Sequence, residues 1–404
     1  MTTAAAAGTV ETGAAAPARV APIRQADDFD RDVWSVLGVP IDRLNAAEAL
    51  AAIERAARDG ERLSFVTPNV NFLVRATRDE AERRRIIDAD LSLVDGAPLV
   101  MFGRLLGMTS LTRCAGSDIF EALRKRASFG GKGLRVFFFG GRDGAGEAAA
   151  AALKAEGRGL QPVGALNPGF GDIEALSAPA IIDAINEAAP DFLVVALGAS
   201  KGQAWIDANQ DRLTVPVIAH LGAVVDFTAG TIARAPAFLR KLNLEWAWRI
   251  RAEPSLWRRY WHDGLALACL SVGKLLPALG GPAATGRPAE ASAVIEQGAT
   301  RVHLSGDLCA DDLGPVRAAF RAASRGAGDV ILDFTKAGRV DAAFLGQVLM
   351  LEKSARRRGA AVMVAGAPAP LRRLLKAHSM AYAPAPSAVA PGREAGEAGF
   401  AATQ

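Results

Sequence analysis

The sequence predicts an α/β protein in which a parallel sheet is covered by helices on both faces, followed by a smaller α/β domain. Between about residues 32 and 221, short apolar runs rich in β-branched and aromatic residues alternate with Ala-, Leu- and Arg-rich segments of helical period. Continuous apolar runs of this length are typical of strands buried on both faces. A stretch rich in Gly, Pro, Ala and Ser over residues 279–292 indicates a linker, and the alternation begins again beyond it.

Each expected strand is followed by Gly or a polar residue and then by a helical pattern. In the first domain we expect strands at 63–66, 91–94, 135–140, 191–198 and 215–222. In the second we expect strands at 300–306, 329–334 and 360–366, and helices at 311–324, 341–358 and 369–379. The expected plan is a disordered leader (1–30), a sheet domain (31–232), a basic aromatic appendage (233–281), a linker (282–292), a second domain (293–385) and a disordered tail (386–404).

Composition limits the class of protein. With 404 residues, 50% hydrophobic and 22% charged, the chain is an ordinary globular one. Its three cysteines, Cys114, Cys269 and Cys309, are far apart, which argues against a disulfide scaffold or a zinc site and favours a reducing cytosol. Residues 1–25 lack the basic segment followed by an apolar segment that a secretory signal needs.

The positive charge is concentrated in residues 234–261. This segment holds four of the six tryptophans and seven basic residues against two acids, so it carries about +5 while the whole chain carries +4. A surface that meets phosphate or lipid is therefore expected there. The apolar run at 264–281 is interrupted by Lys274 and Pro277 and is shorter than the roughly 20 residues that span a bilayer. It is either an amphipathic element on a membrane surface or an ordinary core helix.

Polar residues that directly follow strands are candidate ligand-binding residues, because ligands bind at the carboxyl ends of parallel strands. They include Thr67, Asn69, Asp95, Gly140, Gly141, Gly198, Lys201 and Asp226. Asp95 is a candidate general base if apolar neighbours raise its pKa; the alternative is that it caps an Asp-Gly turn. Gly140 and Gly141 either let backbone N–H groups approach a diphosphate or serve a tight turn.

Seven sequence blocks then follow one another at intervals that carry a resemblance. They are T-x-N (Thr67, Asn69), VDGAPLV, RCAGSD (Arg113, Asp118), FFFGG, PDFLVVALGASKGQAWI, GAVVDFTAGTIARAP and LEWAWRIRAEPSLWRRY. Over about residues 34–262 they resemble the WecG/TagA/CpsF glycosyltransferases. The resemblance implies a Rossmann-like core with a helical, membrane-proximal appendage. It also implies an inverting enzyme, independent of metals and cofactors, that moves a sugar from a UDP-sugar to a polyprenyl-diphosphate-linked saccharide in cell-surface or exopolysaccharide synthesis.

The resemblance also implies roles for single residues. Asp95 matches the catalytic base, Thr67, Asn69 and Arg113 match positions that line the active-site pocket, and Gly140, Gly141 and Asp226 fall in blocks associated with the nucleotide-sugar. Asp118, Gly198, Lys201 and Gln203 lie in matching blocks and are expected to bind substrate as well.

The arginines of the appendage have two open interpretations. Without a metal ion, the charge that grows on the departing diphosphate needs guanidinium and amide donors, and Arg234, Arg249 and Arg258 are candidates. The alternative for each is a solvated helix face.

One block departs from the family pattern. The usual P-K-Q-E reads SKGQ here, so Gly202 and Gln203 stand at the Gln and Glu positions. This leaves the donor sugar open among ManNAc-, GlcNAc-, glucose- and uronate-type.

Residues 293–385 resemble a STAS domain, through VILDFTKAGRVDAAFLGQVLMLEKSARRRGAAVMVAG. In regulatory STAS domains a Ser or Thr follows the Asp at the start of the helix and is phosphorylated. Here Ala342 follows Asp341, so we expect no such switch. The domain is then expected to bind a protein partner or a small ligand.

Three functions follow from these observations. The first is the transferase, cytoplasmic and peripheral at the inner face of the cell membrane, with an anionic membrane surface as a partner. The second is a non-catalytic scaffold, in which a degenerate transferase fold recruits partners through the STAS-like domain. The third is a nucleic-acid binder, suggested by the basic aromatic segment; we expect anionic vesicles to be preferred over nucleic acid. The oligomeric state, including a homo-oligomer, stays open.

Overall fold

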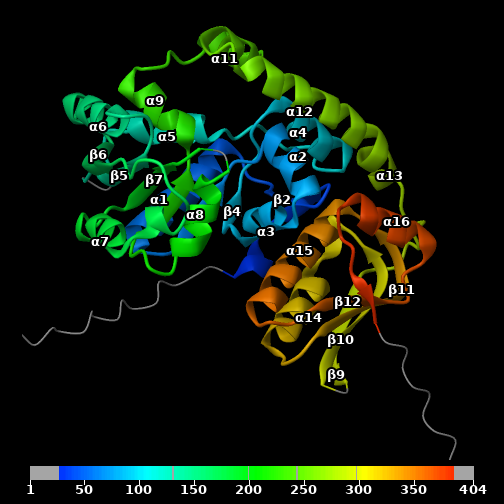
Figure 1. Cartoon of the computed structure of the whole chain (residues 1–404). Helices are drawn as coiled ribbons and strands as arrows, with labels where there is room; N and C mark the ends of the chain where they lie inside the picture. Colours follow the sequence, from blue (N-terminus) through cyan, green and yellow to red (C-terminus); the bar gives the residue numbers. More distant parts are fainter. Residues whose placement is uncertain (1–26, 130–131, 199, 243, 297, 386–404) are drawn as a thin grey trace, which may run out of the picture.

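The computed structural model describes residues 27–129, 132–198, 200–242, 244–296 and 298–385, so nearly all of the expected leader and the whole expected tail lie outside the described residues. At its centre is a six-stranded parallel sheet in the order β4-β3-β8-β7-β5-β6 (Figure 1). The strands are β3 (Leu63–Val66), β4 (Leu91–Ser92), β5 (Leu134–Gly140), β6 (Leu160–Leu166), β7 (Phe192–Ala196) and β8 (Val217–His220). The predicted α/β class is confirmed.

The sheet is buried on both faces because neighbouring residues of one strand enter different cores. In β5, Phe138 packs in one cluster with Phe65, whereas Phe137 and Phe139 pack in another with Trp205. The covering helices are α1 (Ala46–Asp59), α2 (Val70–Arg78), α3 (Glu80–Asp88), α4 (Ala97–Leu105), α5 (Gly116–Lys125), α6 (Ala145–Glu156), α7 (Pro179–Glu187), α8 (Gly202–Asn209) and α9 (Gly222–Ala229). The continuous apolar runs therefore predicted the strand environment correctly.

Three strands of this domain were not predicted. β6 contains Pro162 and Gly164, which are poor strand formers, but β6 is an edge strand, where a missing N–H is tolerated. An antiparallel hairpin, β1 (Val33–Val36) and β2 (Val39–Asp42), precedes α1. β4 also ends two residues earlier than expected.

The appendage follows the core as a chain of helices. They are α10 (Ala237–Lys241), α11 (Glu245–Ala252), α12 (Leu256–Leu270), a π-helical turn η3 (Ser271–Leu275) and α13 (Leu276–Ala278). Figure 1 shows them arching over the core and then descending toward the C-terminal domain. No helix in the described part of the chain is long and apolar enough to cross a bilayer.

The C-terminal domain is a five-stranded sheet in the order β13-β12-β11-β10-β9, parallel except for the pair β9–β10. Its elements are β9 (Glu290–Glu296), β10 (Ala299–Leu308), α14 (Gly314–Arg325), β11 (Val330–Val340), α15 (Ala342–Arg357), β12 (Val362–Ala365), α16 (Ala369–Ala377) and β13 (Ala383–Pro384). The expected three strands and three helices are present. β9 was not expected, and it takes in the end of the predicted linker.

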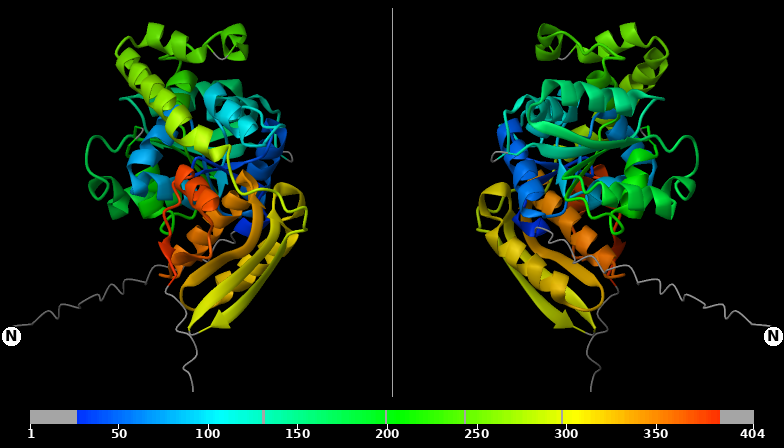
Figure 2. Two further views of the ribbon diagram at one scale, coloured as in Figure 1. Left: turned by 90° about the vertical axis from the view of Figure 1, so that its right-hand side faces the viewer. Right: turned by 90° about the vertical axis from the view of Figure 1, so that its left-hand side faces the viewer.

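The two domains share one core. A single hydrophobic cluster runs from Phe29 and Trp34 of the N-terminal segment to Phe344 of α15. α15 approaches β1 so closely that a Cβ built on Gly346 would lie 1.9 Å from the carbonyl oxygen of Val33. The side views in Figure 2 place α11 at the end of the molecule farthest from β9.

This junction also contains buried charge. The fully buried Lys353 places its Nζ 2.9 Å from Asp28 Oδ1. Arg31 pairs with Asp28 and Asp42 at 2.8 Å each. Burial in this network is supported by ionic and hydrogen-bond partners on both domains, which is the condition under which buried charges are tolerated.

Candidate active site

A cavity of about 1220 Å³ lies between the carboxyl ends of the central strands and the appendage. Residues that follow β3, β4, β5, β7 and β8 form its base, and residues of α11 and α12 form its cover. Sites for one small ligand occupy roughly 300–1,000 Å³, so this cavity has room for more than one substrate.

Most of the predicted site residues meet in this cavity. Those that line it are Asp95, Thr67, Asn69, Arg113, Gly140, Gly141, Gly198, Lys201, Asp226 and Arg249. Those that do not line it are Asp118, Gln203, Arg234 and Arg258. The roles of both groups remain predictions, since placement in a cavity is not binding.

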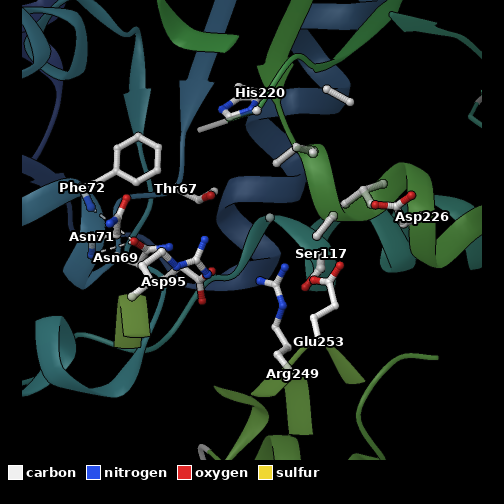
Figure 3. A pocket seen from close by; sticks show the side chains of 18 of the residues that line it. Thr67, Asn69, Asn71, Phe72, Asp95, Ser117, His220, Asp226, Arg249 and Glu253 are labelled. Carbon is white, nitrogen blue, oxygen red and sulfur yellow. Dashed lines mark hydrogen bonds between the residues drawn. The ribbon is translucent and has the colours of Figure 1, made fainter. Parts of the chain in front are cut away.

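Asp95 lies in the loop after β4, which ends at Ser92, and its backbone N–H donates to the carbonyl oxygen of Pro68 at 2.8 Å. This bond holds its loop beside the end of β3. Figure 3 shows the Asp95 side chain on the same side of the cavity as Asn69 and Asn71. The pKa of Asp95 is raised to about 6, because burial raises it strongly, Arg113 opposes the rise and the negative charge of Glu245 adds to it. Such a carboxylate is mostly ionised at neutral pH and still basic enough to take up a proton.

Arg113 fixes this side of the cavity. Its Nη1 lies 3.7 Å from Asp95 Oδ1 and 3.4 Å from Glu245 Oε2, while its Nη2 lies 2.6 Å from Asp118 Oδ2. Asp118 also accepts hydrogen bonds from Arg234 at 2.5 Å and from Arg240 at 3.1 Å. Asp118 and Arg234 therefore join the appendage to the core, which explains why neither lines the cavity.

The opposite side of the cavity is formed at the ends of β5 and β7. Gly140 and Gly141 have φ angles of +89° and +99°, a conformation that favours glycine. A Cβ on Gly140 would lie 2.8 Å from the carbonyl oxygen of Ala196, so the backbone of β5 passes β7 at a distance that only glycine allows. Asp226 of α9 faces the same side, 4.0 Å from Nε of Arg142.

The altered SKGQ block begins α8. Lys201 donates from Nζ to the carbonyl oxygen of Gly171 at 2.6 Å, which ties this helix to the loop after β6. Gln203 is buried under the cavity rather than exposed in it. Asn69 caps α2, because its Oδ1 accepts the N–H groups of Asn71 and Phe72 at 3.0 and 3.3 Å.

Polar contacts hold the cover on the core. Glu253 of the appendage pairs with Arg142, and Asn71 donates to both carboxylate oxygens of Asp263 at 3.3 Å. None of the described residues of α11 is buried. In the cover, α11 therefore contacts the core mainly through charged and polar side chains, whereas Leu267 and Leu270 of α12 pack against the hydrophobic core.

Several cavity residues were missed by sequence reasoning. They include Asn71, Phe72, Arg142, His220, Glu245, Trp246, Glu253, Tyr260 and Asp263. His220 and Arg142 directly follow or end predicted strands, so their position was a usable signal. No such signal pointed to the acidic residues of the appendage, because only the net positive charge of that segment entered the prediction.

In the part of the chain that the structure describes, no group of three or more His, Cys, Asp or Glu side chains is arranged to hold a metal ion. Metal independence of the reaction remains a prediction.

Comparison with known families decides the classification. A family model described as the glycosyl transferase WecG/TagA/CpsF family matches residues 34–279. The chain belongs to this family. A second model, described as Mlab, STAS domain, matches residues 292–381. The WecG/TagA/CpsF assignment confirms the predicted glycosyltransferase, and the second match confirms the STAS fold of the C-terminal domain.

Two curated relatives that this WecG/TagA/CpsF protein resembles share a name. A protein of Bacillus spizizenii is 27% identical over 239 residues, which is 59% of this chain and 85% of the relative. One of Staphylococcus aureus is 26% identical over 226 residues, 55% of this chain and 85% of the relative. Both are named N-acetylglucosaminyldiphosphoundecaprenol N-acetyl-beta-D-mannosaminyltransferase. A solved SsGBP variant matches with 13% identity over 57% of this chain and 78% of its own, at a TM-score of 0.19, which is too low to bear on the fold.

Proposed function

We propose that this WecG/TagA/CpsF protein transfers a sugar from a UDP-sugar to a polyprenyl-diphosphate-linked saccharide, with inversion at the anomeric carbon and without a metal ion. The observation that carries the proposal is Asp95, a carboxylate whose pKa is raised to about 6 at one side of a cavity whose other side is formed by Gly140 and Gly141. The names of the relatives support a lipid-linked acceptor and an N-acetylated sugar.

The chemistry follows from the two sides of the cavity. An acceptor hydroxyl beside Asp95 gives its proton to the carboxylate and forms a bond to the anomeric carbon of the donor sugar. The bond from that carbon to the β-phosphate oxygen breaks, and UDP leaves toward Gly140 and Gly141. Because the hydroxyl attacks from the side opposite the leaving group, the configuration at the anomeric carbon inverts.

The leaving diphosphate needs positive partners. Arg249 of α11 and Arg142 after β5 both line the cavity, and Lys201 lies at the start of α8. Guanidinium groups form short, charge-assisted hydrogen bonds with phosphate oxygens. Arg249 comes from the appendage, so closing the cover and stabilising the leaving group are coupled in this proposal.

The appendage is also the proposed membrane contact. Trp261, Leu265, Val272 and Leu276 recur at helical spacing, and each is more than half exposed. Exposed Arg258 lies over the ring of Trp257, with 5.7 Å between its guanidinium carbon and the ring centroid. Exposed apolar side chains next to arginines are typical of helices that lie in a headgroup layer. We therefore place the protein at the inner membrane face, where it would meet its lipid-linked acceptor.

The test uses the full chain with a lipid-linked acceptor and UDP-ManNAc, UDP-GlcNAc, UDP-glucose or UDP-glucuronate, with UDP release as readout. Asp95→Asn should lower kcat by about 100-fold to 10,000-fold, because it removes the general base. The matched control is Asp211→Asn, a surface residue paired with Arg62, which should leave kcat unchanged. Turnover should persist in EDTA. Absence of turnover with every donor would favour the scaffold, and a requirement for a divalent ion would contradict the proposed chemistry.

A further inference from the structure

His220 is a cavity residue with no role in the reaction described above. It ends β8, and Figure 3 shows its ring at the top of the cavity, near Thr67. Both ring nitrogens are shielded from solvent and have no hydrogen-bond partner among the described residues. Buried polar atoms without a partner are rare in folded proteins and lower stability by about 1–3 kcal/mol each. Because His220 lines the cavity, its imidazole has hydrogen-bonding capacity that no described residue uses and that a ligand could use after the ring rotates.

The sheet order places His220 between the two sides of the cavity. β8 has β3 on one side and β7 on the other. Asp95 lies beyond β3, at the end of β4, whereas Gly140 lies beyond β7, at the end of β5. If the acceptor binds at Asp95 and the nucleotide at Gly140, the group between them is the transferred sugar. In this arrangement His220 faces the transferred sugar and not the uracil base.

The SKGQ block explains why a histidine fits here. A Cβ built on Gly202 would lie 2.2 Å from Cδ2 and 2.5 Å from Nε2 of His220. The imidazole thus occupies the volume that any side chain at position 202 would need. The glutamine that the family pattern usually has at position 202 is incompatible with His220 in this orientation, so the two positions form one unit.

The protonation state sets what His220 can recognise. Burial, with a smaller contribution from the charge of Arg75, lowers its pKa to about 4. The ring is therefore neutral at neutral pH, with one N–H donor and one acceptor nitrogen. A half-turn about χ2 exchanges ring carbons and nitrogens, so either nitrogen can face the ligand. Phosphate oxygens only accept hydrogen bonds, whereas the hydroxyl and acetamido groups of a sugar both donate and accept.

We propose that His220 hydrogen-bonds a hydroxyl or acetamido group of the transferred sugar and determines donor specificity in place of a side chain at position 202. The inference rests on the proposed function, because it needs a nucleotide-sugar in the cavity. In this proposal, His220 contacts the sugar, does not contact the nucleotide, and thereby determines which donor is bound.

The test compares the binding of UDP with that of a UDP-sugar by calorimetry, using the donor that the wild-type chain binds most tightly among the four named above. His220→Ala should weaken UDP-sugar binding about tenfold, as expected for loss of a hydrogen bond to a buried group. It should leave the Kd of UDP within about twofold of wild type, because a single lost sugar contact does not touch the nucleotide. His220→Asn keeps a donor and an acceptor and should recover part of the loss. The matched control is His303→Ala, an exposed histidine on the C-terminal sheet that should change neither Kd.

The outcomes separate the two proposals. Equal weakening of UDP and UDP-sugar would place His220 at the nucleotide and overturn the inference, as would unchanged binding of both. A wild-type chain that binds neither compound would instead contradict the proposed function, and the inference with it. The unliganded melting temperature of each variant shows whether the change has unfolded the protein. The double variant His220→Ala, Gly202→Gln should change the order of preference among the four donors; an unchanged order would contradict the exchange of roles.

Discussion

The transferase core, residues 27–229, is contacted by two other parts of the chain, and they are attached in opposite ways. The STAS domain shares a hydrophobic core with it, and nearly all of the inward side of α15 is buried. The appendage rests on it through ion pairs such as Arg142 with Glu253, while its own α11 has no buried residue among those described. From this difference we expect the STAS domain to stay fixed on the core and the cover over the cavity to open more readily.

Interaction strengths support this interpretation. Breaking a buried ion pair costs about 3–5 kcal/mol, whereas an exposed pair contributes about 0–1 kcal/mol. Local opening follows the weaker contacts. The Lys353–Asp28 pair belongs to the first class and the Arg142–Glu253 pair, with a well-exposed arginine, to the second.

The largest expected effect is at the buried pair. Asp28→Ala removes the carboxylate closest to the fully buried Lys353, leaving Asp90 at 3.7 Å, while Arg31 keeps its pair with Asp42; it should lower the free energy of unfolding by about 3–5 kcal/mol. Chemical denaturation measures it. The control is Asp27→Ala, which removes the exposed pair with Arg321 and should change the free energy by less than about 1 kcal/mol. Equal effects of the two variants would mean that the junction is no tighter than a surface contact.

The second effect tests the packing of α15 on β1. Gly346→Ala forces a methyl group against the carbonyl oxygen of Val33 and should lower the free energy of unfolding by about 1–3 kcal/mol. Gly273→Ala is the matched control in the appendage, where a Cβ would meet nothing within 4 Å, and it should be neutral or slightly stabilising. A stable Gly346→Ala protein would show that the two domains can separate at this helix.

The third effect compares the pH response of the two regions. The charges of Lys353 and Arg31 outweigh burial and lower the pKa of Asp28 below its usual 3.8. Its contribution to stability is thus present above pH 3.8 and lost as the pH falls through the lower folded value. For Asp95, whose pKa is raised to about 6, kcat/KM should fall about tenfold per pH unit below 6. Activity should therefore be lost on acidification at a pH where the junction is still intact, as circular dichroism can verify.

The same sign argument gives Asp95 an effect on stability. Because its folded pKa lies above the usual value, the protonated form favours folding, and stability falls as the pH rises through about 6. Asp95→Asn should therefore melt at the same temperature as wild type or higher at pH 7.5, while losing activity. A lower melting temperature would mean that the carboxylate is structural.

The smallest effect is at the cover. Glu253→Gln removes the pair with Arg142 and should change the free energy of unfolding by less than about 1 kcal/mol. Limited trypsin digestion should nevertheless cut the appendage faster, because its arginines spend more time away from the core. If digestion is unchanged, the cover is held by other contacts and the contrast with the STAS domain is weaker than proposed.

The sequence predicted the parts of the fold whose signal is local. Buried strands such as 192–196 are continuous apolar runs, and the residues after strands converge because all six strands are parallel. Strand β6 was not predicted, because Pro162 and Gly164 interrupt the apolar pattern that is typical of a strand. The contact between the two domains was not predicted, for a different reason. In the sequence, Lys353 resembles a solvated charge of a basic helix, and its pairing with Asp28 joins residues that are 325 positions apart. The position of His220 near a strand end was a usable signal, but its lack of a hydrogen-bond partner is visible only after folding.

The cover is anchored to the C-terminal domain at the π-helical turn η3. Leu275 belongs to the core that the two domains share, and Lys274 donates to Ser379 Oγ at 2.5 Å, so this end of the long helix is anchored to the C-terminal domain. From Ser271 back to Leu256 the helix extends about 22 Å, so a tilt of about 10° at η3 sweeps its far end through about 4 Å. The STAS domain therefore holds one end of this helix, and the length of the helix makes a small rotation at η3 a larger displacement over the cavity.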